Sequence, residues 1–144
     1  MPVWPGTAMT NGGRTGPLPP PRPRGTDDAD IVALAESLLG APAHILPPMG
    51  KVSSATVLLR RHIRTASDAV RVAAAELLPR DDPRRVAAEK AVDEGLHRVE
   101  RVGPGDGLRS AFGYARSLAQ SARELRGHLQ KLALIAEAER GKKR

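Results

Sequence analysis

The chain has 144 residues and a formal net charge of +7, which suits one small domain and favours anionic partners. It contains no cysteine, so disulfides, thiolate metal ligands and a cysteine nucleophile are excluded. Hydrophobic residues make up 40% of the chain and aromatic residues only 2%, so a core of Ala, Val, Leu and Ile is expected, which suits closely spaced helices.

The first residues predict a tail. Residues 1–26 are rich in Pro and Gly and show no periodic apolar face, so we expect them to be disordered. Pro17, Pro20 and Arg22 fit a PxxPxR spacing, which can dock on an aromatic groove but is also frequent in plain linkers. No apolar signal segment follows Met1, and no run reaches the roughly 20 apolar residues of a membrane helix, so we expect a cytoplasmic protein that does not cross a membrane.

Two helices are predicted before Pro79. Thr26-Asp27-Asp28 supplies capping groups for a first helix, which ends at Gly40. A linker over 41–50 follows. The second helix is expected to begin at Ser53 or Ser54, and Pro79 stops it.

A third helix is predicted from Pro83 to about Val102, with Asp82 as its N-cap. Its inward residues are expected to be Ala88, Val92, Leu96 and Val99, joined by Val102. Gly95 on the same face costs about 1 kcal/mol relative to alanine, which is tolerable where another helix approaches closely.

The longest pattern covers residues 106–139, where Asp106 is expected to cap a fourth helix. Apolar residues recur there at alternating steps of three and four without a proline, which is typical of a long helix packed against others. They are Leu108, Ala111, Ala115, Leu118, Ala122, Leu125, Leu129, Leu132 and Ala136.

These elements predict an all-α, up-and-down antiparallel bundle over residues 27–140, with three long helices, one shorter N-terminal helix and a basic tail at 141–144. At 1.5 Å per residue the last helix is about 50 Å long and the third about 30 Å. We therefore expect Leu129, Leu132 and Ile135 to extend beyond the third helix. They would meet the second helix, the first helix or another copy of the chain, so a homodimer through them is one hypothesis.

Three stretches carry a resemblance. They are LLPRDDPRR at 77–85, AVDEGLHRV at 91–99 and GPGDGLRSAFGYARSLA at 103–119. Together they resemble an uncharacterised family of small actinobacterial (Streptomyces-type) helical proteins labelled as associated with natural-product biosynthesis. The resemblance implies a helical fold and a link to that process, and it implies no activity, cofactor or site residue.

A basic stripe is the main candidate surface. Arg109, Arg116 and Arg123 recur every seven residues on the predicted outward side of the last helix, with Arg126 beside them and Lys131 further along. Such a stripe could lie along phosphates, but no stacking aromatics interleave it, and a solvated helix face has the same pattern. The excess of arginine over lysine fits either phosphate recognition or the codon usage of a GC-rich genome.

The remaining polar motifs have structural interpretations. Glu94 and His97 form one E-x-x-H string, whereas di-iron bundles use two such strings, so no metal site is predicted. His62 and His128 sit beside apolar seams, and His44 lies in a linker.

The acidic turn and the glycine-rich turn are also expected to have structural rather than catalytic roles. Asp81-Asp82 is expected to cap a helix rather than to act as a catalytic pair, and GPGDG at 103–107 is expected to form a turn, because no strand precedes it.

We therefore expect a non-enzymatic accessory protein that binds a protein partner or a second copy of itself, without a cofactor, a metal or a small-molecule substrate. The alternative is a nucleic-acid-binding regulator that uses the arginine stripe of the last helix.

Overall fold

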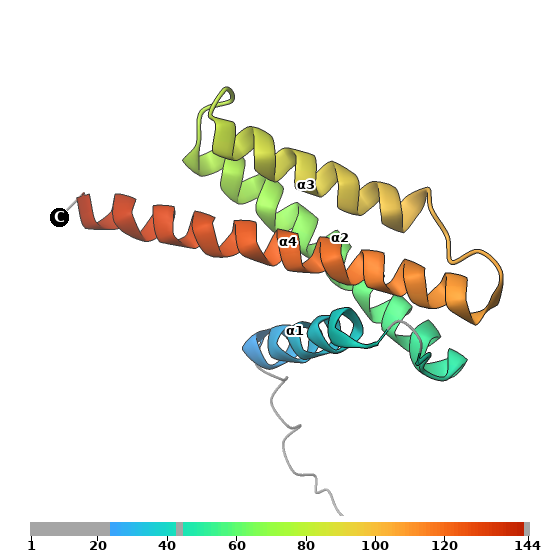
Figure 1. Ribbon diagram of the computed structural model, residues 1–144. Coiled ribbons are helices and arrows are strands. Elements are labelled where there is room, and N and C mark those ends of the chain that lie inside the picture. The colour runs from blue at the N-terminus through green and yellow to red at the C-terminus, as the bar shows by residue number, and fades with distance from the viewer. Residues whose placement is uncertain (1–23, 43–44, 143–144) are drawn as a thin grey trace, which may run out of the picture.

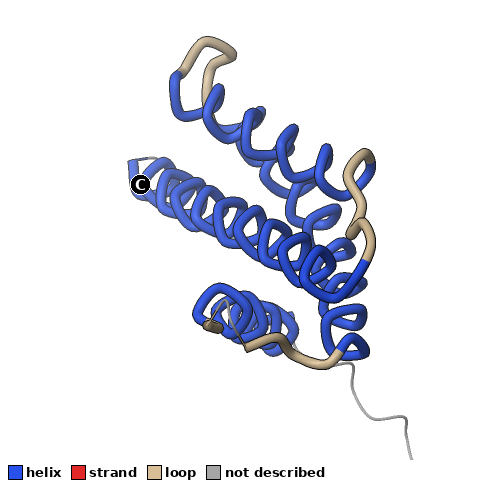
Figure 2. Tube along the Cα trace, turned by 45° about the vertical axis from the view of Figure 1, so that its right-hand side comes forward, coloured by secondary structure: helices blue, strands red, loops and turns tan. Residues whose placement is uncertain are grey.

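The computed structural model describes residues 24–42 and 45–142. These residues form four helices joined by loops, with no strand among them (Figure 2). The helices are α1 (Arg24–Gly40), α2 (Met49–Leu77), α3 (Pro83–Glu100) and α4 (Gly107–Lys142). The all-α prediction is confirmed. The PxxPxR motif and His44 lie outside the described residues.

The longest helix, α4, is central to the arrangement (Figure 1). The α3 and α1 helices flank α4 and do not contact each other, while α2 packs against all three. The chain runs up, down and up through α2, α3 and α4, and α1 runs antiparallel to α4. This is the predicted bundle, with α1 added on one side.

The core is a seam of aliphatic side chains between α2 and α4. Leu59 and Ile63 of α2 and Leu118 and Leu125 of α4 are fully buried, and Val92 of α3 is 1% exposed. Burying one such side chain contributes about 1.5–3 kcal/mol, so this seam supplies much of the stability of the bundle. The predicted α4 stripe is buried or half-buried along its length, and the buried face also includes Phe112, Tyr114, Ala119 and Ser121.

The predicted N-cap of α3 is confirmed. Asp82 is the N-cap, its carboxylate accepts a hydrogen bond from the Arg84 backbone amide at 2.8 Å, and Pro83 opens the helix. The loop before α4 contains Gly105 and Gly107 with φ of 67° and 86°, which an L side chain rarely adopts, so GPGDG is a turn as predicted.

Several helix ends differ from the prediction. The α2 helix begins at Met49 rather than at Ser53 or Ser54, because the Pro48 carbonyl already accepts the Val52 amide at 3.2 Å. Val102 was expected to face inward, but α3 ends at Glu100 and Val102 is 41% exposed in the loop. The α1 helix begins at Arg24 and α4 continues to Lys142, each slightly beyond its predicted limit.

Candidate functional site

The C-terminal end of α4 projects past the other helices (Figure 1). The residues expected to project, however, do not. Leu132 is 4% exposed, and Leu129 and Ile135 are half-buried against the core. Leu132 and Ile135 share a shallow pocket with Pro83 and Ala87 of α3, so they lie beside the first turn of that helix rather than beyond it.

The extra length of α4 over α3 lies partly at the N-terminal end of α4, which the comparison of helix lengths did not anticipate. Figure 1 shows that α4 begins well past the end of α3, because the loop after Glu100 carries the chain outward before α4 starts. Part of the extra length of α4 therefore lies near Gly107, and the projecting part follows Ile135.

An open face runs along the C-terminal part of α4. We define the open α4 face as residues at helical steps of three and four: Gly127, Gln130, Leu134, Glu137, Ala138 and Gly141. Leu134 is 69% exposed, the largest exposed fraction among the large hydrophobic side chains in the described part of the chain. The sequence pattern missed Leu134 because it lies off the apolar seam. A leucine outside a continuous seam is the signal that could have found it.

Two arginines of the basic stripe hold α1 in place. The Arg116 side chain donates to the Leu39 carbonyl at 3.1 Å, and the Arg123 guanidinium pairs with the Glu36 carboxylate at 3.0 Å. Arg123 lies at the surface as predicted, with its side chain 52% exposed, whereas Arg116 is half-buried. The face that carries them is the face on which α1 packs, with Ala35 and Leu38 of α1 buried there.

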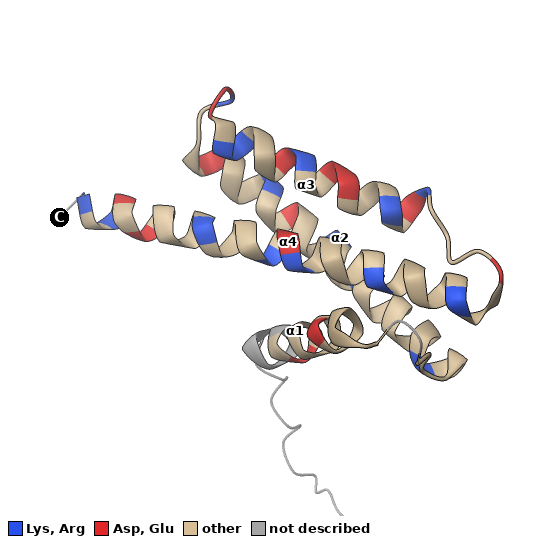
Figure 3. Cartoon of the chain, viewed as in Figure 1, with Lys and Arg blue, Asp and Glu red and all other residues tan. Residues whose placement is uncertain are grey.

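The other three members of the stripe remain at the surface. Arg109 and Lys131 are exposed and Arg126 is half-buried, and none of them forms an ion pair with another described residue. Lys and Arg recur along the whole of α4 and also on α2 and α3 (Figure 3). The five predicted residues therefore do not form one uninterrupted basic surface.

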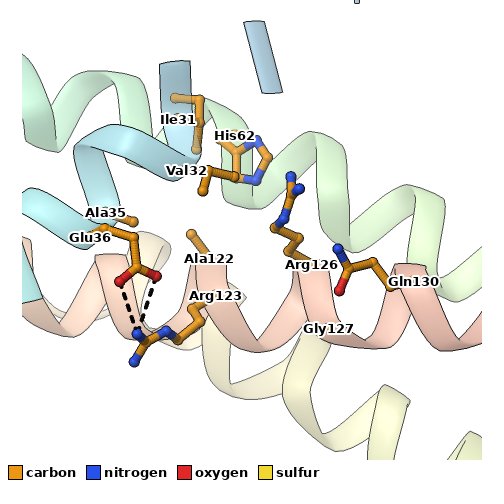
Figure 4. A pocket seen from close by; sticks show the side chains of 10 residues that line it. All are labelled: Ile31, Val32, Ala35, Glu36, His62, Ala122, Arg123, Arg126, Gly127 and Gln130. Atoms are coloured by element: carbon orange, nitrogen blue, oxygen red, sulfur yellow. Dashed lines mark hydrogen bonds and ion pairs between the residues drawn. The ribbon is translucent and has the colours of Figure 1, made fainter. Parts of the chain in front are cut away.

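A pocket of about 250 Å³ lies between α1 and α4 (Figure 4). Its apolar wall contains Ile31, Val32, Ala35 and Ala122. Its rim contains the Glu36–Arg123 pair, His62 of α2, Arg126, Gly127 and Gln130. Gly127 and Gln130 also belong to the open α4 face, so the pocket and that face are continuous. Such an arrangement can accept an apolar side chain whose neighbours carry charge.

A polar cluster joins α2, α3 and α4 inside the bundle. The Tyr114 hydroxyl donates to the Arg98 carbonyl and accepts hydrogen bonds from Arg60 at 3.2 and 3.3 Å. The Arg98 side chain donates to Ser121 Oγ at 2.6 Å and to the Ser117 carbonyl at 3.2 Å. The side-chain polar groups are paired with each other or with backbone carbonyls, so the cluster stabilises the packing. Sequence reasoning did not identify it.

The other polar candidates keep their structural interpretations. Glu94 and His97 are exposed on the side of α3, and no group of three metal-ligating side chains occurs within residues 24–42 and 45–142. Burial, and then the charge of Lys131, lowers the pKa of His128 below its usual value. Asp81 is exposed in the turn before α3.

Residues 29–141 match a family of unknown function (DUF6415). The chain belongs to this family. The match runs from within α1 to the last turn of α4, so the DUF6415 region of the chain includes both the α1–α4 contact and the whole of the open α4 face. This agrees with the resemblance of residues 77–119 to an uncharacterised helical family. No curated protein and no solved structure matches the chain. In the described part of this DUF6415 chain, no helix has the length and hydrophobicity needed to span a membrane.

Proposed function

We propose that this DUF6415 chain is a non-enzymatic accessory protein that binds another protein chain through the open α4 face. The observation that carries the proposal is the exposure of Leu134, at 69%, on a helix end that no other described helix covers. Large apolar side chains on an open helix face are the anchors by which such a helix binds a groove of another protein.

The charged groups support this choice over nucleic-acid binding. A phosphate-binding stripe needs free cations, and Arg116 and Arg123 are already engaged by α1. Arg126 and Lys131 instead lie beside the open α4 face, where they are suited to pair with acidic side chains of a partner.

The family resemblance suggests where the partner belongs. We expect the protein to work in the cytoplasm of an actinobacterium, beside proteins of natural-product biosynthesis. This part of the proposal is supported by the resemblance of residues 77–119 and not by geometry.

Co-purification from the native cell tests the proposal. Tagged wild-type chain is compared with Leu134→Asp and with the matched control Val72→Asp, which alters an exposed apolar side chain of α2 that is 57% exposed. We expect one or more protein chains to co-purify with the wild type and with Val72→Asp but not with Leu134→Asp, and their binding to be reproduced with purified components. Equal recovery with both variants would refute the proposal.

A further inference from the structure

We propose that the chain which packs on the open α4 face is a second copy of this protein, antiparallel to the first across a two-fold axis near Lys131. The inference rests on the proposed function and adds the identity of the partner and the register of the contact. It follows from the way the charges and the small residues are placed along α4.

The apolar part of the contact is self-complementary. In an antiparallel pair, residues at equal distances on either side of the axis face each other. An axis near Lys131 places Leu134 of each copy over Gly127 and Gln130 of the other, at the mouth of the pocket between α1 and α4. A side-chain carbon added at Gly127 would meet nothing within 4 Å, so this part of α4 leaves room for a leucine.

The charges on one flank match the same register. Arg126 and Glu137 are 11 residues apart, about three helical turns, so they lie on the same side of α4 and at similar distances from the axis. Antiparallel packing brings Arg126 of each copy opposite Glu137 of the other, which gives two equivalent ion pairs. Neither side chain forms an ion pair with a described residue of its own chain.

The contact covers only a few helical turns, and interfaces below roughly 1,200 Å² are weak, so the dimer is expected to form at micromolar to millimolar concentration.

Sedimentation equilibrium of the full chain over a range of concentrations tests the inference. The wild type, with a monomer mass of 15.3 kDa, is expected to approach twice that mass as concentration rises. Arg126→Glu and Glu137→Arg each replace two attractive contacts with two repulsive ones, so each variant alone should associate about tenfold more weakly. Circular dichroism should show unchanged helix content, because neither substitution falls in the core.

The decisive sample is an equal mixture of Arg126→Glu and Glu137→Arg chains. In the mixed dimer each altered side chain faces one of opposite charge, so association should recover to about the wild-type strength. Glu94→Arg makes the same charge change on an exposed position of α3, away from the open α4 face, and should leave association unchanged. A wild type that stays monomeric at every concentration, or a mixture that does not recover, would overturn the inference.

The outcome separates the inference from the proposed function. If the chain is monomeric but Leu134→Asp abolishes co-purification of a different protein, the dimer is wrong and the proposed function stands. If Leu134→Asp leaves co-purification and self-association unchanged, the proposed function itself is wrong.

Discussion

Gly95 of α3 lies directly against Ile63 of α2. A Cβ built on Gly95 would be 3.2 Å from Ile63 Cγ2 and 3.5 Å from Leu125 Cδ1 of α4. Both neighbouring side chains are fully buried. The glycine therefore sits where three helices meet, and the close approach expected from the sequence is confirmed.

Gly95→Val should destabilise the bundle by about 2 kcal/mol, because the added carbons enter a packed core. Gly95→Ala should fall within about 1 kcal/mol of the wild type, because its better helix propensity opposes the contact with Ile63. Gly113→Ala is the matched control: nothing lies within 4 Å of its Cβ position, so it should stabilise the chain by about 1 kcal/mol. Chemical denaturation measures all three. A Gly95→Val chain as stable as the wild type would contradict the packing.

Tyr114→Phe should cost about 1–2 kcal/mol, because it removes the hydroxyl that joins Arg60 of α2 to the Arg98 carbonyl of α3. The ring itself would still fill its site, where Tyr114 is 6% exposed. Thermal and urea unfolding measure the loss. No change in stability would show that the polar cluster does not hold the three helices together.

Asp82 should make the start of α3 sensitive to pH. Hydrogen bonds from the Arg84 side chain and then from its backbone amide lower the pKa of Asp82 below its usual value. Because the folded-state pKa is depressed, the stabilisation is present above the unfolded pKa and is lost as pH falls through the folded pKa.

Asp82→Ala should therefore lower the unfolding midpoint at pH 7, and its difference from the wild type should shrink below about pH 4. Asp82→Ser keeps a capping oxygen without the charge. This variant should therefore retain part of the stability at pH 7, and its stability should depend less on pH. A difference between wild type and Asp82→Ala that stays constant from pH 7 to pH 3 would contradict this account.

Arg116→Ala should loosen α1. It removes the bond to the Leu39 carbonyl at the end of that helix, worth about 1 kcal/mol for a half-buried charged donor. Hydrogen exchange of the α1 amides should then rise about fivefold, while exchange in α2 stays unchanged. Arg109→Ala is the control, because Arg109 is exposed and forms no bond with α1. Equal hydrogen exchange of the α1 amides in both variants would show that Arg116 does not stabilise α1.

The number of helices, their order and most of their ends were predictable from the sequence. The α4 stripe, the stop at Pro79 and the Asp82-Pro83 start of α3 each depend on residues close together in the chain, where periodicity and capping act. The α2 start was missed because Pro48 begins the helix with its backbone carbonyl and no side-chain cap. A pattern of capping side chains cannot reveal such a start.

The candidate site was less predictable, because it depends on how the helices lie beside one another. The register of α3 against α4 places Leu132 and Ile135 beside the first turn of α3 rather than beyond it, and the loop after Glu100 sets that register. The side of α4 that α1 covers decides that Arg116 and Arg123 are engaged while Arg109 is exposed. Neither relationship is encoded in the period of a single helix.

Photo-cross-linking in the native cell tests most directly whether the open α4 face meets another protein chain. A photoreactive amino acid is placed at Leu134 in one chain and at Val72 in another, and the adducts are identified by mass spectrometry. We predict protein adducts from position 134, including one with a second copy of the chain, and none of comparable yield from position 72. No protein adduct at 134, or equal adducts at both positions, would contradict the account.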